Sequence, residues 1–525
     1  MPTPKQGYPR PKSVVYEQLS IKGMADSRAP SGDPNIASLI YNAYPLHSST
    51  SRDLVGRPGV THLATLGSPG LGQGGFQYRK LNGTVFTVDF INGLMYTVNW
   101  ATGVHTNVPL GAIGALQTTD KIYTTILADK LVISDGVRKP FTWDGAVFVD
   151  MPNCPVLFGQ PVVYYAKLTG ISKANPVQIV WSEENDPYTG YDTQVNPATL
   201  ALYDNQWVLG QTSQDRLYVL IAAEDALYFS RARSWSMITG PNEDNFRSTG
   251  NREAVSATVG CTLPSACIFR NGEIWFQDRD GFFWVIPLGG QPVPIWEGFR
   301  ETIAGADKDP PATVGGRANL CSMVEWPLLP AVMATVAVIN GASWRYRILV
   351  WDPETKQALA VWDLPQAVTP THLAAVNDLN ELDRVIMVLD ETGHVMYFGT
   401  PQNGPWQDVI YSGNVAITHQ VKGAELGWDD TQEKDWESIV ALYFGSNLNA
   451  STTIGYTTPR RAVSVPQNIT AAALGHDAEI RRKVGIKQLG RWLQPETTHT
   501  QINEQFRFQG FEVGAYLVAN GPRIP

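Results

Sequence analysis

The chain has 525 residues, of which 17% are charged and 10% aromatic, and its formal net charge is −9. An acidic balance disfavours tight binding to DNA or RNA, because proteins that grip nucleic acid carry a basic surface. The charged fraction lies below the ~25% of an average protein. This low charged fraction has two possible explanations: burial of surface between subunits, or a β-rich protein whose surface carries neutral polar side chains.

The cysteines and the N-terminus bear on the cellular compartment. The four cysteines, at positions 154, 261, 267 and 321, are too few for a disulfide framework and lack the spacing of a zinc site. We expect free buried thiols in a reducing cytosol. The N-terminus has no apolar core of the kind a secretory signal needs, and prolines interrupt the most apolar stretch, 326–341. These features predict a soluble protein made in the cytoplasm.

Residues 1–50 are rich in proline, glycine and serine, with one short apolar run at 36–41. This composition predicts an extended N-terminal arm. Such a segment is ordered only where another element holds it, so a docking arm and a disordered one both stay open. The turn-forming sequence Arg57-Pro-Gly marks the transition to the next region.

From 51 to 410, β-forming runs are separated by Asn-Gly and Asp-Gly pairs, as after Leu81, Ile91 and Arg270. Such pairs supply the positive φ angles of tight hairpin turns. Recurring hairpins predict a β-propeller of about six blades, because radial packing buries sheet faces and protects edges. A less regular stretch near 176–215 predicts an insertion or a long loop. The expected blades are 62–118, 119–168, 175–235, 256–300, 318–365 and 366–403.

Residues 411–525 contain several runs in which apolar and polar positions alternate. Phe506 and Phe508, for example, share one face, opposite Arg507. This alternation is typical of a sheet buried on one side. It predicts a β-sandwich-like platform domain after the propeller, so the whole chain is predicted to be all-β.

No catalytic or cofactor motif accompanies these strands. The sequence has no P-loop, no Gly-x-Ser-x-Gly turn and no histidine pair at metal-ligand spacing. The glycines of 67–75 lack the β-α-β context of a dinucleotide site and predict a surface loop. Asp278 and Asp280 resemble the start of a calcium loop without its later acidic ligand, so we expect a hairpin turn there. The nearest carboxylate cluster that could serve glycoside hydrolysis is Glu183, Glu184, Asp186, Asp192 and Glu224.

The order of motifs resembles the tail nozzle family of short-tailed bacteriophages, which includes packaged-DNA stabilisation (tail hub) proteins. The resemblance covers almost the whole chain in the order arm, propeller, platform, although 170–215 has no place on the family plan. It rests on the following sequences: Leu54-Val-Gly-Arg-Pro-Gly-Val, Asp129-Lys-Leu-Val-Ile-Ser-Asp-Gly, Phe141-Thr-Trp-Asp-Gly, Asp225-Ala-Leu-Tyr-Phe-Ser-Arg, Asn245-Phe, Ile268-Phe-Arg-Asn-Gly-Glu-Ile-Trp-Phe, Gly490-Arg-Trp-Leu and Phe506-Arg-Phe-Gln-Gly-Phe-Glu-Val.

The resemblance implies a virion structural protein without enzyme activity, cofactor or bound metal. Subunits would form a sixfold ring below the portal and adaptor, with the platforms forming the tube and the propellers projecting outward. The ring would extend the DNA channel and retain the genome until ejection, and its walls would let DNA pass without tight binding. Implied partners are other copies of the chain, the head-to-tail adaptor and tail fibres or a tail needle, with no membrane insertion. The implied location is the virion tail, assembled in the host cytoplasm.

A closed ring needs a large heterologous interface, for which the platform is our candidate. The residues expected at contacts with other subunits or the adaptor are Arg57, Trp428, Trp436, Tyr443, Arg481, Arg482, Arg491 and Trp492. The tryptophans could instead belong to the core of the platform, and the basic run 481–483 could be a solvated face. Two other functions stay open: a propeller that binds or cleaves host surface polysaccharide, and a cytosolic scaffold with an apolar binding groove.

Overall fold

The structure is a computed structural model of the chain. It describes residues 13–517, except for short gaps of up to four residues and for 25–35, 46–52, 196–201, 209–215, 241–251, 300–320, 378–383, 427–433, 471–478 and 502–506. Every regular element among the described residues is a β-strand or a single 3-10 turn, so this part of the chain is all-β, as predicted.

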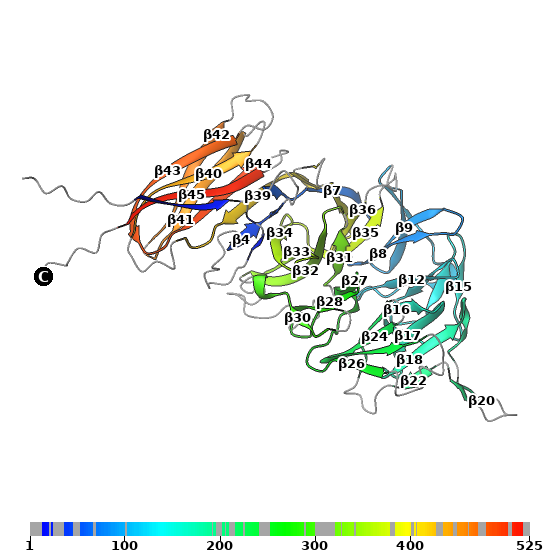
Figure 1. The fold of residues 1–525 in the computed structure, drawn as a ribbon. Helices are drawn as coiled ribbons and strands as arrows, with labels where there is room; N and C mark the ends of the chain where they lie inside the picture. Colours follow the sequence, from blue (N-terminus) through cyan, green and yellow to red (C-terminus); the bar gives the residue numbers. More distant parts are fainter. Residues whose placement is uncertain are drawn as a thin grey trace, which may run out of the picture.

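Seven groups of four or five strands, called sheets here, make up the larger part of the molecule (Figure 1). The last two are joined through strands of the sandwich into one 14-stranded sheet. The first three sheets contain β8 (Gly72–Arg79), β9 (Val85–Ile91), β10 (Leu94–Asn99) and β11 (Val104–Asn107); β12 (Tyr123–Leu127), β13 (Lys130–Ser134), β14 (Phe141–Trp143) and β15 (Phe148–Asp150); and β16 (Leu157–Tyr164), β17 (Lys167–Ser172), β18 (Gln178–Glu183) and β19 (Asp186–Gly190), with β22 (Gln206–Val208) added to β18. The next two contain β23 (Val219–Ala223), β24 (Ala226–Arg231), β25 (Ser234–Thr239) and β26 (Arg252–Ser256); and β27 (Cys267–Arg270), β28 (Glu273–Gln277), β29 (Phe283–Pro287) and β30 (Val293–Pro294). The last two contain β31 (Met323–Trp326), β32 (Ala331–Asn340), β33 (Ser343–Trp351) and β34 (Ala358–Asp363); and β35 (Pro370–Asn377), β36 (Arg384–Asp390), β37 (His394–Phe398) and β7 (Val60–Thr65).

The seven sheets are arranged as a closed, propeller-like ring. Their innermost strands contact one another in the order β8, β12, β16, β23, β27, β31, β35 and back to β8. The seventh sheet is completed by β7, which precedes all other strands of the ring in the chain and pairs antiparallel with β37. This closure joins the beginning of the ring to its end, so no sheet of the ring is left without neighbours.

The ring has seven sheets rather than about six, because two expected features were misplaced. The hairpin between β16 and β17 turns at Tyr165 and Ala166, whose φ angles are 46° and 57°. Neither residue is a usual turn former, so residue types alone do not predict this hairpin. The expected insertion at 176–215 also begins too early, since β18 and β19 are regular strands of the third sheet.

The Asn-Gly turns behave as the sequence predicts. Asn92 and Gly93 have φ angles of 50° and 74°, and Asn271 and Gly272 have 46° and 79°. Two successive positive φ angles are the mark of the type I′ hairpin turn.

The glycines near residue 70 do not form the expected surface loop over the whole of 67–75. Gly72 to Gly75 lie in β8, the innermost strand of the first sheet. A Cβ on Gly74 would lie 2.5 Å from the Ile122 carbonyl oxygen, and one on Gly75 would lie 2.2 Å from Met387 Cε. Glycine is needed at 74 because a backbone carbonyl next to β12 lies this close, whereas the contact at 75 is with the flexible end of a methionine side chain.

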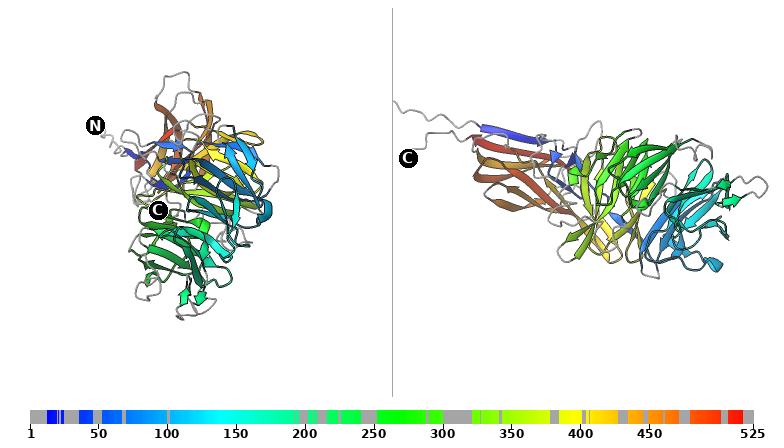
Figure 2. Two further views of the ribbon diagram at one scale, coloured as in Figure 1. Left: turned by 90° about the vertical axis from the view of Figure 1, so that its right-hand side faces the viewer. Right: turned by 90° about the horizontal axis from the view of Figure 1, so that it is seen from below.

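A β-sandwich lies at one end of the molecule, beside the sixth and seventh sheets (Figures 1 and 2). Its sheets combine segments from before and after the ring. One has the order β43 (Glu479–Gly490), β40 (Lys434–Phe444), β45 (Arg507–Leu517), β6 (Leu54–Gly56) and β5 (Ala43–Pro45), with β1 (Ser13–Leu19) also on β45. The other has the order β42 (Ala462–Thr470), β41 (Asn449–Thr457), β44 (Gln494–Gln501), β39 (Gly413–Lys422) and β4 (Leu39–Tyr41). The short strands β2 (Gly23–Met24) and β3 (Ile36–Ala37) pair with each other, as do β20 (Thr193–Val195) and β21 (Leu202–Asp204).

The sandwich and the ring share continuous hydrogen bonding. Strand β4 pairs in parallel with β34 through Tyr41 and Val361, and β38 (Gln407–Ile410) pairs in parallel with β7 through Val409 and Thr61. Residues before 57 therefore do not form a separate arm where they are described, since they supply strands to both sheets of the sandwich.

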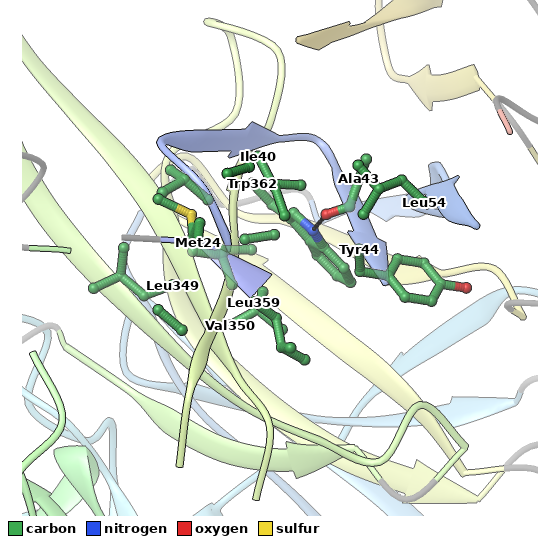
Figure 3. Packing of buried hydrophobic residues seen from close by; sticks show 14 of the residues in the cluster. Met24, Ile40, Ala43, Tyr44, Leu54, Leu349, Val350, Leu359 and Trp362 are labelled. Atoms are coloured by element: carbon green, nitrogen blue, oxygen red, sulfur yellow. Dashed lines mark hydrogen bonds between the residues drawn. The ribbon is translucent and has the colours of Figure 1, made fainter. Parts of the chain in front are cut away.

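Apolar packing reinforces this connection (Figure 3). Trp362 of the sixth sheet is fully buried, and its indole N–H donates to the Ala43 carbonyl oxygen at 3.1 Å. Its ring centroid lies 6.0 Å from that of Tyr44. Met24 and Leu54 belong to the same cluster, so the N-terminal segment covers an outer part of the ring with its own apolar side chains.

Candidate functional site

The junction of ring and sandwich centres on Arg57, one of the predicted contact residues. Arg57 is 1% exposed, and its guanidinium forms a bidentate ion pair with Asp408 at 2.8 and 2.6 Å. Its other N–H groups donate to Asn42 Oδ1 at 3.0 Å, to the Pro58 carbonyl at 3.1 Å and to the Asp363 carbonyl at 2.7 Å. Arg57 is therefore buried and bonded within the chain in this structure.

Asn42 completes the junction from the N-terminal segment. It occupies the left-handed region at φ 55°, which asparagine tolerates better than most residues. Its side chain accepts from the Asp363 backbone N–H at 2.7 Å and donates to the Thr418 carbonyl at 2.9 Å. Its own carbonyl accepts from His419 Nδ1 at 2.7 Å. Asn42 thus connects the sixth sheet to the sandwich strand β39.

Two further predicted contact residues lie in the interior of the sandwich. Trp436 is 0% exposed and packs against Tyr16 of β1, with ring centroids 5.5 Å apart. Tyr443 is also buried, and its hydroxyl lies 2.5 Å from Thr497 Oγ1 in the opposite sheet. Burial raises the pKa of Tyr443. Both aromatic side chains stabilise the sandwich of this chain and are not surface groups.

The basic strand β43 presents its predicted residues in opposite directions. Arg481 is exposed and lies 3.6 Å from Glu512 of β45. Arg482 is half-buried and is a source of positive potential at Tyr443, on the inner side of the sheet. Among the described residues, Arg482 Nε has no hydrogen-bond partner.

The remaining predicted contact residues lie near the end of β43. Arg491 is exposed and Trp492 is half-buried. Trp428 lies outside the described residues. The structure therefore leaves Arg481, Arg482, Arg491 and Trp492 as the predicted residues with accessible side-chain surface.

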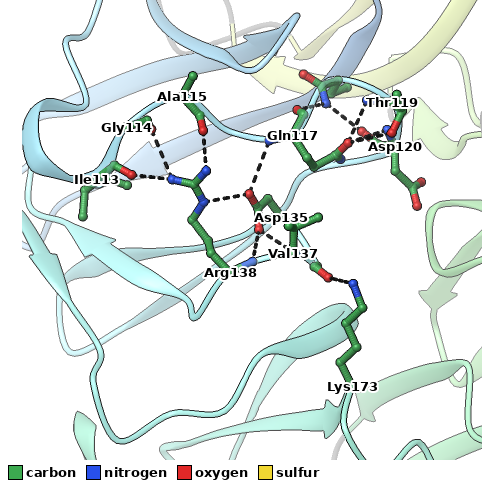
Figure 4. Close-up of polar contacts among 12 residues, drawn as sticks. Ile113, Gly114, Ala115, Gln117, Thr119, Asp120, Asp135, Val137, Arg138 and Lys173 are labelled. Atoms are coloured by element: carbon green, nitrogen blue, oxygen red, sulfur yellow. Dashed lines mark hydrogen bonds and ion pairs between the residues drawn. The ribbon is translucent and has the colours of Figure 1, made fainter.

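Neighbouring sheets of the ring are held together by polar contacts on one of its rims (Figure 4). Arg138 follows the second sheet's Asp135 turn, and its Nε donates to Asp135 Oδ2 at 3.0 Å. The same guanidinium donates to carbonyl groups of residues 113–115, in the loop after the first sheet. Lys173, after β17, donates to the Gly136 carbonyl. These contacts link the first three sheets.

Three of the five acidic residues considered for glycoside hydrolysis are described by the structure. Glu183 and Glu184 are exposed, while Asp186 accepts hydrogen bonds from the Tyr188 N–H and the Thr189 hydroxyl, which help lower its pKa. Asp192 and Glu224 lie outside the described residues.

Asp278 stabilises a hairpin turn, as the sequence predicts. Its carboxylate accepts from the N–H groups of Asp280 and Phe282, each at 2.9 Å, and from the Trp284 indole at 2.7 Å. The described part of the chain contains no group of three or more side chains that could hold a metal ion. It also contains no helix long and apolar enough to cross a membrane.

We found no protein-family model and no curated protein that matches the chain. Several solved structures align with parts of the chain. The extracellular domain of a one-component system from B. thetaiotaomicron aligns at 10% identity and a TM-score of 0.41, over 86% of this chain and 62% of that one. Sqt1 from Chaetomium thermophilum aligns at 13% identity and 0.35, over 61% and 82%. An exo-β-1,3-galactanase from Phanerochaete chrysosporium aligns at 11% identity and 0.24, over 84% and 96%. These similarities carry no conclusion about activity or partners.

Proposed function

We propose that the chain is a structural protein of a bacteriophage virion. It would be a subunit of a tail nozzle ring that extends the portal-adaptor DNA channel and retains the genome until ejection. The observation that carries the proposal is the placement of the propeller-like ring as one long insertion in the sandwich. Such a subunit can place its sandwich beside neighbouring sandwiches while the inserted ring, a seven-bladed propeller in this proposal, projects from the assembly. The order of sequence motifs supports the same assignment.

Several other features support this role. The Arg57 junction holds the sandwich and the ring together, as a load-carrying subunit requires. The net charge of −9 suits a passage through which DNA moves without tight binding. The acidic loop residues described above stabilise turns or face solvent, which supports a protein without enzyme activity. In this proposal the protein resides in the virion tail, is assembled in the host cytoplasm, and contacts the adaptor and fibres or a needle.

Arg482 is our strongest candidate for a contact between chains. It lies in β43, which is an edge strand of the sandwich among the described residues, and part of its side chain is accessible there. A half-buried guanidinium is stabilised by a carboxylate that binds it in a bidentate manner. We therefore propose that an acidic side chain of a neighbouring subunit or of the adaptor pairs with Arg482.

The mass of the purified full chain tests the proposal, measured by light scattering with and without the adaptor ring. We expect either a sixfold ring of the 57.7 kDa chain or monomers that assemble on the adaptor. A chain that stays monomeric and binds no virion component would contradict the proposal.

Variants of β43 refine this test. Arg482→Met should weaken assembly by about 10-fold or more, because an interfacial carboxylate would lose its charged partner. Arg481→Met is the matched control, since Arg481 points outward and already has Glu512. Equal effects of both variants on assembly would refute a specific role for Arg482. The proposed sixfold assembly would then be tested only by the mass of the unmodified chain.

A further inference from the structure

Two side chains cross the axis of the propeller-like ring from its second sheet. Lys121 lies two residues before the start of β12. Its Nζ donates to the Thr371 carbonyl in β35 and lies 3.5 Å from His372 Nδ1. Tyr123, in β12, hydrogen bonds to Ser265 before β27. Lys121 is 2% exposed. The second sheet is therefore tied across the centre to the fifth and seventh sheets.

Other hydrogen bonds join the strands that surround Lys121. Ser322, before β31, donates to the Leu373 carbonyl at 3.2 Å and accepts from the Leu373 N–H at 3.1 Å. Ser265 donates to the Cys321 carbonyl at 2.5 Å. The fifth, sixth and seventh sheets are thus linked directly at the axis, and Lys121 with Tyr123 connects them to the second sheet.

The groups that face Lys121 offer little compensation for a positive charge. From the sixth sheet it faces Cys321, from the seventh His372, and from its own segment the exposed Asp120. Burial raises the pKa of Cys321 to about 12 and, together with Lys121, lowers that of His372 well below its ordinary value. Both groups are therefore neutral near pH 7, and no carboxylate among the described residues forms an ion pair with Lys121.

We propose that Lys121 is a proton-sensitive strut across the ring axis. In its uncharged form the amine fits among the strands and holds the second sheet to the seventh. In its charged form it favours an opened state in which the amine reaches water and the contact with Thr371 is lost. This inference is independent of the proposed assembly into a virion.

The titration of Lys121 determines how strongly, and in which direction, the opening equilibrium changes with pH. Burial lowers its pKa to about 7 from the ordinary 10.5, and the small opposing effects of Cys321 and Asp120 do not restore it. Opening becomes more favourable as pH falls from about 10.5 to about 7, because the opened state binds the proton more tightly. Between pH 9 and pH 7 we expect opening to increase about 50-fold, and between pH 7 and pH 6 only about twofold.

Hydrogen exchange of the full chain, followed by mass spectrometry, tests the strut. After correction for the intrinsic pH dependence of exchange, the opening equilibrium of β12 and β35 should follow the expected pH profile. In Lys121→Met, which keeps the length of the side chain without its charge, the profile should be flat. A flat profile in the unmodified chain, or the same slope in both proteins, would overturn the proposal.

Labelling with acetic anhydride tests the unmodified protein alone, in case the variant does not fold. Between pH 7 and pH 9 a solvated amine becomes about 100-fold more reactive. For Lys121 this increase in reactivity is opposed by a ~50-fold decrease in the equilibrium constant for opening. Its labelling rate should therefore rise only about twofold. Exposed Lys483 is the internal reference. Equal increases at Lys121 and Lys483 would contradict the strut.

Discussion

Replacing Arg57 by methionine should weaken the connection between ring and sandwich severely. The change removes a buried bidentate ion pair, whose partners Arg57 and Asp408 are 1% and 2% exposed. It leaves the Asp408 carboxylate without its counter-charge inside the protein and the Asp363 carbonyl without its donor. Breaking a buried pair in this way costs about 3–5 kcal/mol, a large share of the ~5–15 kcal/mol that stabilises a typical domain.

A double-mutant cycle separates the ion pair from the general effect of substitution. In Arg57→Met with Asp408→Leu the unpaired carboxylate is gone, so the double variant should be more stable than the sum of the single effects by about 2 kcal/mol or more. The backbone groups that lose Arg57 or Asp408, including the Val60 N–H, still cost about 1–3 kcal/mol.

Scanning calorimetry and urea unfolding followed by tryptophan fluorescence measure these differences. We expect Arg57→Met to lower the main transition and to separate it into two, because the sandwich and the ring then unfold less cooperatively. A loss below about 1 kcal/mol, or additive single effects, would refute the assignment of Arg57 as the central tie of the junction.

Two further substitutions test the inner strands and the acid response. Gly74→Ala should lower the free energy of unfolding, measured in urea, by more than about 2 kcal/mol, because its Cβ would lie 2.5 Å from a backbone oxygen. The control Gly485→Ala should be nearly neutral, because nothing lies within 4 Å of its Cβ. Similar losses of stability in both variants would show that close strand approach is not the reason for glycine at 74. Burial and the neighbouring His499 lower the pKa of His419 to about 3. The stability that depends on neutral His419 is therefore present above pH 6.5 and is lost as pH falls from about 6.5 to about 3. His419→Gln, which can still donate to Asn42, should make the melting temperature less sensitive to pH in that window, and an unchanged pH profile would count against His419 as a source of acid sensitivity.

Turns could be predicted from the sequence wherever the residue types in the turn determine its backbone conformation. Asn92-Gly93 and Asn271-Gly272 adopt the two positive φ angles that their residue types favour. The turns at Ala128-Asp129 and Tyr165-Ala166 have the same backbone form, with φ angles between 46° and 57°. Only Asp129 among these four residues is of a type that favours positive φ. There the pairing of the flanking strands imposes the conformation, and such tertiary effects cannot be recognised from a short stretch of sequence.

The candidate site was less predictable, because its contacts join distant parts of the chain. Arg57 lies in a recognisable turn sequence, yet its ion-pair partner Asp408 follows 351 residues later. Trp436 and Tyr443 are large aromatic residues, and residue type alone does not distinguish an interface from a core. The alternation along β43, with Arg481 outside and Arg482 inside, follows from the period of a strand and could have been used to separate these two residues.

The pairing of β1 with β45 has a consequence for synthesis on the ribosome. Ser13 pairs with Tyr516, so the first strand emerges almost a whole chain length before its partner. At ~5–20 residues per second the delay is on the order of 25–100 s. The propeller-like ring needs no residue beyond its seventh sheet and can fold during this time, whereas β1 must wait with an unpaired edge. A nascent chain therefore passes through a stage with a finished ring and an unfinished sandwich, the stage at which a chaperone or premature association with another chain would act.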